Sequence, residues 1–252
     1  YIIIITQLNK GLLIMLNIEY EIIRYIRRNR VSTTELADAL GKTGELSELK
    51  SIGEDQHKVG RVRCIFAAYE SNYEVHDQIR DIKEGEIVIV FIHECKGRAI
   101  LGDLVSRFVL MYQGAEALVV DGAIRDVARL RREKYAVWAN GFTPIGCFNT
   151  PANPFPSDKR KELEKKYNGG IAICDDGGVV IIPANQVDDK MLEKLQRIEL
   201  QEDVWSYCLN TLKWDTKRII CEKEYLKNSD ILPDTYKEKL MQLSKSFDNR
   251  KP

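Results

Sequence analysis

Histidine is scarce in this sequence, and the three histidines present are scattered. His57, His76 and His93 form neither an H-x-x-x-H nor an H-E-x-x-H pair, the spacings at which helices present zinc ligands. The six cysteines contain no C-x-x-C spacing, and most lie in apolar stretches such as Ile171–Cys174. The pattern therefore argues against the common zinc motifs and predicts reduced core thiols in a cytoplasmic protein.

The chain also lacks a net charge and a long apolar run. It carries 38 Lys and Arg against 38 Asp and Glu, so we expect neither a nucleic-acid nor a membrane partner. The apolar start, Tyr1–Ile5, is too short to span a bilayer, and no basic segment precedes it as in a signal peptide. Residues 1–14 come before Met15, and we treat them as a leader of uncertain origin.

Three glycine motifs that mark large enzyme classes are missing. There is no G-x-S-x-G elbow, no Walker loop and no G-x-G-x-x-G fingerprint, which argues against an α/β-hydrolase, a P-loop enzyme and a dinucleotide-binding fold. A basic run on one expected helix (Arg129, Arg131, Arg132 and Lys134) is interpreted as a solvated face.

What the sequence does contain is an alternation of strand-like and helix-like segments through residues 59–140, which predicts an α/β core. The expected strands there are Val59–Ala68, Glu86–Ile92, Ala117–Val120 and Val137–Ala139, and the expected helices are 75–82, 103–112 and 127–134. Outside this range we expect helices at 18–29, 33–40 and 158–167, and a hairpin of Ile171–Cys174 and Val179–Ile182.

Residues 15–190 are therefore expected to form one α/β domain. The remainder, 191–252, is expected to be a helical extension that ends in a charged tail. Its aromatic residues, among them Trp205 and Trp214, indicate that it packs against other apolar residues and does not extend freely into solvent.

The clearest candidate site is Ala117–Asp126, where an apolar strand leads through Asp121-Gly122 to Arg125 and Asp126 at a helix start. Sheets of this class place ligands at such strand ends. Arginine can bind a carboxylate with two hydrogen bonds, and aspartate supplies a hard oxygen for Mg²⁺ or Mn²⁺. The alternative is an ordinary aspartate N-cap with a surface arginine.

Two weaker candidates remain open. Gly102-Asp103-Leu104 also opens a helix, and its backbone N–H groups could cradle an anion, although a plain helix start explains it as well. Asp175-Asp176-Gly177-Gly178 could supply metal ligands, but a tight hairpin turn is the favoured interpretation.

Over residues 30–190, these segments together resemble the family of the regulator of ribonuclease activity A and the 4-hydroxy-4-methyl-2-oxoglutarate aldolases. The resemblance rests mainly on Gly102-Asp103-Leu104 followed by the D-G-x-x-R-D segment that ends at Asp126, with support from Phe142–Pro144 and Asp175–Pro183. It implies an α/β/α sandwich of the swivelling β/β/α type and a homotrimer or homohexamer with sites shared between subunits.

In the aldolase branch the resemblance also implies a lyase that cleaves a C–C bond in a 2-oxoacid, by retro-aldol cleavage or oxaloacetate decarboxylation through a pyruvate enolate. Arg125 would bind the oxoacid, Asp126 would hold the metal, and the amides of Gly102 to Leu104 would bind the carboxylate. Asp103 would lie next to the metal's water ligands. A neighbouring subunit would add an acidic residue, with Glu199, Glu202 and Asp203 in the right part of the chain.

The sequence departs from the family pattern in three places. Arg129 stands where the aldolase branch has an acid, and the stretch between Gly102-Asp103-Leu104 and Asp121-Gly122 is about one residue longer. Residues 149–170 replace a shorter strand connection, and the chain continues well past Pro183. The alternative function is a non-catalytic protein that binds and regulates a ribonuclease, as in the other branch. A methyltransferase label also attached to the family is not supported, since no glycine-rich nucleotide loop follows the first strand.

Overall fold

The computed structural model describes residues 18–227 and 229–248. The expected leader, residues 1–14, lies outside the described residues. The chain divides into two compact units, Tyr1–Asp188 and Asp189–Pro252. No helix among the described residues combines the length and apolar character needed to cross a membrane.

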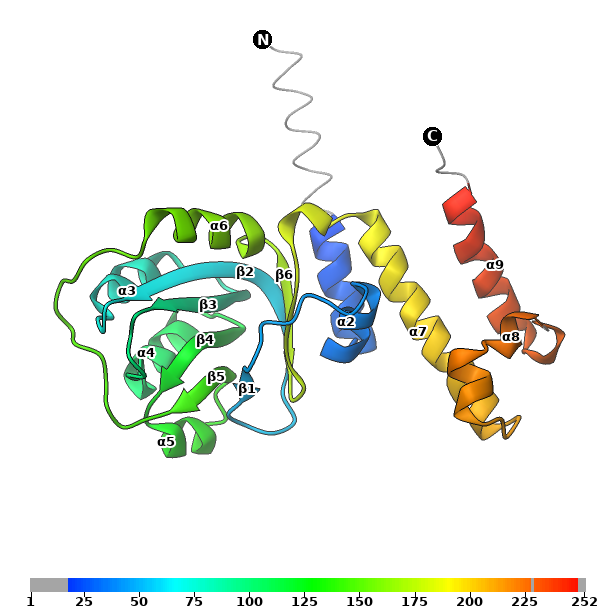
Figure 1. Ribbon diagram of the computed structural model, residues 1–252, viewed down its shortest axis with the longest axis horizontal. Coiled ribbons are helices and arrows are strands. Elements are labelled where there is room, and N and C mark those ends of the chain that lie inside the picture. The colour runs from blue at the N-terminus through cyan, green and yellow to red at the C-terminus, as the bar shows by residue number, and fades with distance from the viewer. Residues whose placement is uncertain (1–17, 228, 249–252) are drawn as a thin grey trace, which may run out of the picture. The chain divides into compact units, whose positions relative to one another are not determined.

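The first unit is built on one seven-stranded sheet (Figure 1). The strands are β1 (Lys50–Ser51), β2 (His57–Ala68), β3 (Glu86–His93), β4 (Ala117–Ile124), β5 (Val137–Phe142), β6 (Ile171–Asp175) and β7 (Gly178–Ile182), in the spatial order β1-β5-β4-β3-β2-β6-β7. Strands β2, β3, β4 and β5 run parallel to one another, whereas β1 pairs antiparallel with β5, β6 with β2, and β7 with β6. The parallel strands therefore end on one edge, where the candidate site lies.

Both faces of the central strands are buried, as expected for parallel strands covered by helices. Val88 and Val90 of β3 pack on one face with residues of α3 (Tyr73–Gln78) and α5 (Val127–Arg132), while Ile87 and Ile89 pack on the other face with Phe155. The other helical segments of this unit are residues 18–29, α2 (Thr33–Ala39), η1 (Ile79–Asp81), α4 (Asp103–Arg107), the π-turn η2 (Phe108–Tyr112), α6 (Ser157–Tyr167) and η3 (Ala184–Gln186). This arrangement of helices on both faces of a mixed sheet confirms the expected α/β/α class.

Local signals near the N-terminal end of this unit are borne out. Ser32 and Glu35 form a capping box at α2: the Ser32 Oγ accepts from the Glu35 N–H, and the Ser32 N–H donates to the Glu35 carboxylate. Gly41 follows with a φ of 75°, a left-handed conformation that suits glycine after a helix end.

Strand β4 differs from its expected bounds. The strand was expected to end at Val120, but β4 continues through Ile124, and the register with β5 shifts between Val120 and Ala123. A Cβ on Gly122 would lie 2.8 Å from Ile92 Cδ1, so glycine is needed there for close packing inside the sheet. The real turn comes only at Arg125 and Asp126.

The second unit consists of helical segments with their own apolar cluster. These are α7 (Asp189–Asn210), the π-turn η4 (Lys217–Cys221), α8 (Glu224–Lys227), η5 (Ser229–Ile231) and α9 (Asp234–Asp248). Val204, Cys208, Ile219 and Tyr225 are buried together in this unit, and Trp205 Nε1 donates to the Tyr225 hydroxyl. The expected charged tail is therefore helical through Asp248.

Candidate functional site

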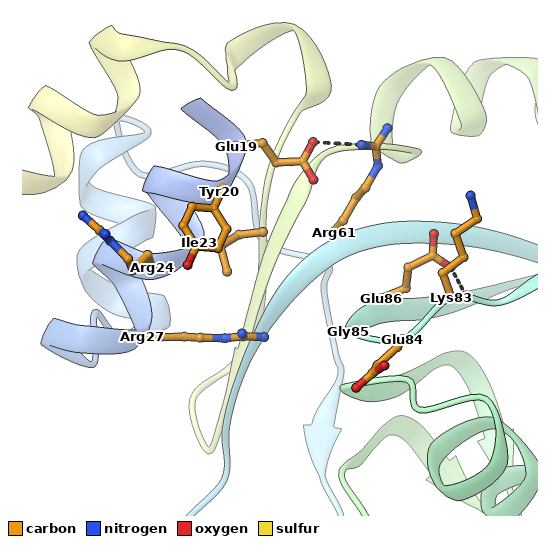
Figure 2. Close-up of a pocket in the computed structure, with 10 residues that line it drawn as sticks. All are labelled: Glu19, Tyr20, Ile23, Arg24, Arg27, Arg61, Lys83, Glu84, Gly85 and Glu86. Atoms are coloured by element: carbon orange, nitrogen blue, oxygen red, sulfur yellow. Dashed lines mark hydrogen bonds and ion pairs between the residues drawn. The ribbon is translucent and has the colours of Figure 1, made fainter. Parts of the chain in front are cut away.

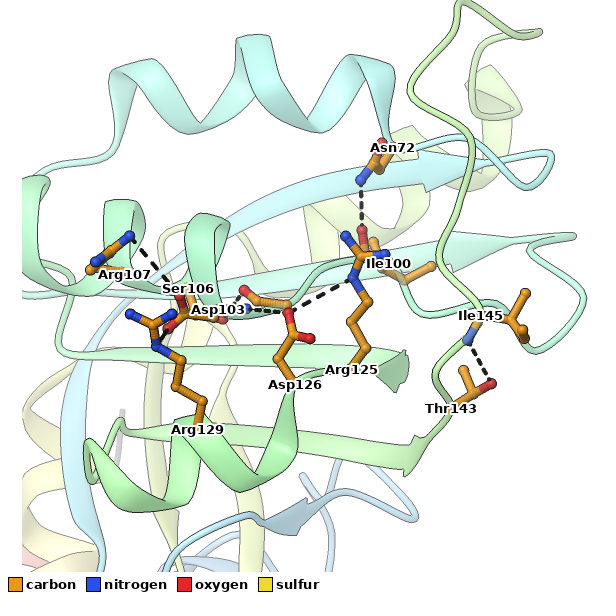
Figure 3. Close-up of polar contacts among 11 residues, drawn as sticks. Asn72, Ile100, Asp103, Ser106, Arg107, Arg125, Asp126, Arg129, Thr143 and Ile145 are labelled. Carbon is orange, nitrogen blue, oxygen red and sulfur yellow. Dashed lines mark hydrogen bonds and ion pairs between the residues drawn. The ribbon is translucent and has the colours of Figure 1, made fainter.

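Arg125 and Asp126 form the turn that joins β4 to α5. Asp126 occupies the N-cap position in a left-handed conformation, with φ 61° and ψ 26°, yet its side chain makes no hydrogen bond to its own helix. Instead its Oδ2 accepts from the Asp103 N–H at 3.0 Å, across the turn into α4 (Figure 3). Asp126 therefore stands at the N-cap position without capping α5, and its side chain joins the turn after β4 to the turn before α4.

Gly102 makes this meeting sterically possible. A Cβ added there would lie 2.2 Å from Asp126 Oδ2 and 2.8 Å from Arg125 Cγ. Real Cβ atoms do not approach other heavy atoms so closely, so any side chain at Gly102 would push both residues away. The glycine thus serves the site, since its own φ of −146° is open to every residue.

Asp103 lies almost buried beside two arginines. Its side chain is 10% exposed, with Oδ1 3.2 Å from Arg129 Nε and Oδ2 4.0 Å from an Arg107 guanidinium nitrogen. The contact with Arg129 has the distance of an ion pair but not the geometry of a hydrogen bond, and Oδ1 accepts none within the described structure. Asp103 is therefore held chiefly by charge.

The expected solvated face of α5 needs correction at two positions. Arg129 pairs with Asp103, and Arg131 Nε donates to the Ile52 carbonyl at 3.0 Å while its guanidinium lies over the Phe142 ring. Helical periodicity shows which residues share a face but not which neighbouring segment reaches that face, so the sequence could not reveal these contacts.

Arg125 and Asp126 line a cavity of about 250 Å³. The side chain of each is about half exposed, at 50% and 47%. The Arg125 guanidinium lies against Gly146, where an added Cβ would be 2.6 Å from Nη1. The cavity is thus large enough for a small organic acid, with a guanidinium and a carboxylate on one wall.

The cavity is also lined by residues that the sequence did not single out. They are Asn72, which precedes α3, His76 within α3, and the loop residues Gly146, Cys147 and Asn149. Asn72 Nδ2 donates to the Ile100 carbonyl at 2.8 Å and so fixes the segment that leads into Gly102. No motif marks these residues, because three segments distant in sequence come together only in the fold.

The remaining candidate, the pair Asp175 and Asp176, forms a hairpin turn as favoured. Asp175 accepts from the Thr33 N–H and hydroxyl, and Asp176 accepts from the Asp55 and Gln56 N–H groups. Both carboxylates therefore hold neighbouring segments of the chain in place at the turn between β6 and β7.

A second cavity, of about 390 Å³, lies between the helix at 18–29 and the turn before β3 (Figure 2). Its charged groups are mostly paired: Glu19 with Arg61 at 2.8 Å, and Arg27 with Glu116 at 3.7 Å. Burial raises the pKa of Glu19, although the Arg61 charge opposes this. None of the candidate residues at the strand ends lines this larger cavity, so volume alone does not mark the site.

The donor set for a metal is sparse. No group of three or more His, Cys, Asp or Glu side chains within the described part of the chain could hold a metal ion. Asp126 is the one candidate carboxylate that reaches the cavity, and its Oδ2 is engaged by Asp103, which leaves Oδ1 as the available donor. Mg²⁺ commonly binds proteins through one or two carboxylates and keeps several water ligands, so this sparse set fits that cation.

Comparison with known proteins covers the segment that carries the site. A family model named RraA-like, described as aldolase/RraA, matches residues 33–181. A protein of Halalkalibacterium halodurans named "Putative 4-hydroxy-4-methyl-2-oxoglutarate aldolase" is 26% identical over 191 residues, which are 69% of this chain and 82% of that protein.

Two solved structures share the fold. One is an uncharacterized protein from Pseudomonas syringae pv. tomato, with a TM-score of 0.60 at 19% identity over 76% of this chain and 93% of that one. The other is Streptomyces coelicolor RraAS2, described as an unusual member of the RNase ES inhibitor RraA protein family, with a TM-score of 0.57 at 21% identity over 73% of this chain and 95% of that one.

Proposed function

The chain belongs to the RraA-like family of aldolase and RraA proteins, and from this premise we propose that it is a divalent-metal-dependent lyase that cleaves a C–C bond in a 2-oxoacid. The observation that carries the proposal is the position of the Asp126 carboxylate. This carboxylate makes no hydrogen bond to the N-terminus of α5, and it lines the cavity together with Arg125.

The substrate would be held by its carboxylate and keto oxygen. Arg125 offers a planar guanidinium for the carboxylate or the keto oxygen. Of the three amides expected to bind the carboxylate, that of Asp103 is already donated to Asp126. We therefore assign this role to the remaining N–H groups, those of Gly102 and Leu104, and to Arg125.

The cation, Mg²⁺ or Mn²⁺, would be held by Asp126 and, when bound, would act as a Lewis acid toward the keto group. Breaking the C–C bond leaves its electron pair on the pyruvate fragment as an enolate. The fixed charge of Arg125 would stabilise the negative charge that develops on its oxygen. Retro-aldol cleavage and oxaloacetate decarboxylation share this enolate, so one site can serve both.

A pyruvate-release assay tests the proposal. Wild-type protein should release pyruvate from oxaloacetate or 4-hydroxy-4-methyl-2-oxoglutarate above the background rate. The activity should disappear with EDTA and return with Mg²⁺ or Mn²⁺. Absence of release from every 2-oxoacid tried, with metal present, would reject the lyase.

Arg129 should limit the affinity for the cation, because it places a positive charge beside Asp103. Arg129→Glu is expected to lower the Mg²⁺ concentration for half-maximal activity, on the order of tenfold, by replacing that charge with a negative one. It should also favour hydroxymethyl-oxoglutarate relative to oxaloacetate. The measurement is a Mg²⁺ titration of pyruvate release from each substrate.

Arg132→Glu is the matched control, since Arg132 is a 71% exposed arginine on the same helix whose ion pair is with the adjacent Glu133. It should leave the Mg²⁺ titration unchanged. Equal shifts in the two variants would mean that overall charge, not the contact of Arg129 with Asp103, sets the affinity.

A second candidate function, the protein-binding regulator, is favoured by apolar side chains that flank the cavity. Leu104, Met111 and Tyr112 are exposed by 65–77% on α4 and η2, and Phe142, the last residue of β5, and Ile145 by more than half. Contiguous exposed apolar surface marks interfaces. The same surface would serve the proposed homotrimer or homohexamer, so its presence alone does not favour a ribonuclease as the partner.

We predict that the full chain is trimeric or hexameric at micromolar concentration, because assembly would cover these side chains. Tyr112→Glu, at the most exposed of them, should shift the mass measured by light scattering toward the monomer. Tyr20→Glu is the control, since Tyr20 is similarly exposed on the helix at 18–29. A monomeric wild type would contradict the assembly.

A further inference from the structure

Cys95 and Cys147 form a thiol pair at the edge of the candidate cavity. Cys147 is partly exposed and lines the cavity, whereas Cys95 is 1% exposed. Cys147 packs against the apolar cluster that contains Cys95, and each thiol perturbs the pKa of the other, so the two side chains are neighbours. The Cys95 thiol also donates to the His93 carbonyl at 3.6 Å. One sulfur is therefore reachable from the cavity while the other is buried beside it.

The backbone holds the two segments together. The Ala99 N–H donates to the Ile145 carbonyl at 2.8 Å, and the Cys147 N–H donates to the Ala99 carbonyl at 2.9 Å. Arg98 adds a hydrogen bond to the Gly146 carbonyl at 3.1 Å and lies over the Phe148 ring. Little chain entropy remains to be lost if the two sulfurs become bonded.

The pair also differs electronically from the other buried thiols. The hydrogen bond from the Cys147 thiol lowers the pKa of Cys95 to about 7, and the same contact raises the pKa of Cys147. Burial raises the pKa of Cys64 to about 12 and that of Cys174 well above its ordinary value. The pair therefore holds a thiolate near neutral pH, which is the reactive form.

We propose that Cys95 and Cys147 are a modification site at which a hydroperoxide converts the thiol pair into an intramolecular disulfide beside the cavity. Cys147 is the sulfur that the hydroperoxide can reach, and it reacts as the thiolate when the proton shared by the pair lies on Cys95. The Cys147 sulfur takes one peroxide oxygen to become a sulfenic acid, and the other oxygen leaves as an alcohol, or as water from hydrogen peroxide.

The Cys95 thiol then attacks the sulfenic sulfur, which forms the S–S bond and releases water. Two thiols and one hydroperoxide thus give one disulfide, one alcohol and one water, and the two electrons lost by sulfur reduce the peroxide. An S–S bond is about 2 Å long, so the two neighbouring sulfurs must move together to form it.

The disulfide would act on Arg125 through Gly146. The Arg125 guanidinium lies against the Gly146 backbone, the residue that precedes Cys147. If Cys147 moves toward Cys95, the adjacent Gly146 backbone moves with it, and the Arg125 guanidinium loses its present contact. This consequence for catalysis rests on the proposed lyase function, whereas formation of the disulfide does not.

The test treats the reduced full chain with a small excess of hydrogen peroxide, blocks free thiols with N-ethylmaleimide and maps the unreduced digest by mass spectrometry. We expect a peptide pair linked through Cys95 and Cys147 that dithiothreitol separates, while Cys64 and Cys174 stay unoxidised. Cys221→Ser, at an exposed cysteine, should leave the link intact. In Cys95→Ser, dimedone should trap Cys147 as the sulfenic acid.

Both cysteines remaining free after peroxide treatment, or linked to other cysteines, would overturn the proposal. In the activity arm, oxidised wild type should release pyruvate more slowly, on the order of tenfold, and recover with dithiothreitol. Cys95→Ser should keep its rate after peroxide. A disulfide that leaves the rate unchanged would overturn the link to Arg125, and a reduced protein without lyase activity would reject only the proposed function.

Discussion

Asp126→Ala is expected to lower metal-dependent pyruvate release by on the order of 10²-fold or more, because among the described residues it removes the one carboxylate that lines the cavity. The residual rate should no longer respond to EDTA. The same change frees the Asp103 N–H, which donates to Asp126 at 3.0 Å. The measurement is the initial rate with oxaloacetate, with and without chelator, at saturating Mg²⁺.

Asp126→Asn separates the two roles of this carboxylate. The amide oxygen can still accept from the Asp103 N–H, so the turn should keep its shape, but the charge that holds the cation is lost. We expect Asp126→Asn to unfold at the wild-type temperature and to be nearly as slow as Asp126→Ala. If it kept full, chelator-insensitive activity, the lyase assignment would give way to the binding-protein alternative.

Local signals in the sequence were sufficient where one segment determines its own structure. The capping box of Ser32 and Glu35, the buried strand β3 and the hairpin turn after Asp175 all lie where they were expected. In each case the signal is a short run whose hydrogen bonds or packing direction follow from nearby residues.

The sequence was less informative where distant segments decide the outcome. The two-residue strand β1 is too short to show a period, and it exists only because Lys50 and Ser51 pair with β5. Strand β4 runs past Gly122 because neighbouring strands supply partners and Ile92 fills the space beside the glycine. Neither fact is contained in a local pattern.

The candidate site shows the same division. The residues on β4 and α4 could be named from the sequence, because strand ends and helix starts carry recognisable patterns. The wall formed by α3 and the loop at 146–149 could not, since those segments reach the cavity only through long-range contacts such as that of Asn72 with Ile100.

Gly102→Ala is expected to reduce activity about as strongly as Asp126→Ala, although it adds only a methyl group and removes no polar atom. The new Cβ would fall 2.2 Å from Asp126 Oδ2 and 2.8 Å from Arg125 Cγ, so both side chains must leave their places at once. A displacement of about 1 Å at a catalytic group can cost on the order of 10²-fold in rate. The assay is pyruvate release as a function of both Mg²⁺ and oxaloacetate, and both apparent affinities should fall together.

Gly141→Ala is the matched control, because Gly141 lies in β5 on the same edge of the sheet and a Cβ there meets nothing within 4 Å. It should keep both the wild-type rate and the wild-type unfolding temperature. Gly102→Ala should keep the unfolding temperature to within a few degrees, since the displaced side chains are half exposed and can move into the cavity. If Gly102→Ala matched Gly141→Ala in rate, the close approach of Gly102 to Asp126 would have no part in catalysis, and the site would have to be sought on another wall of the cavity.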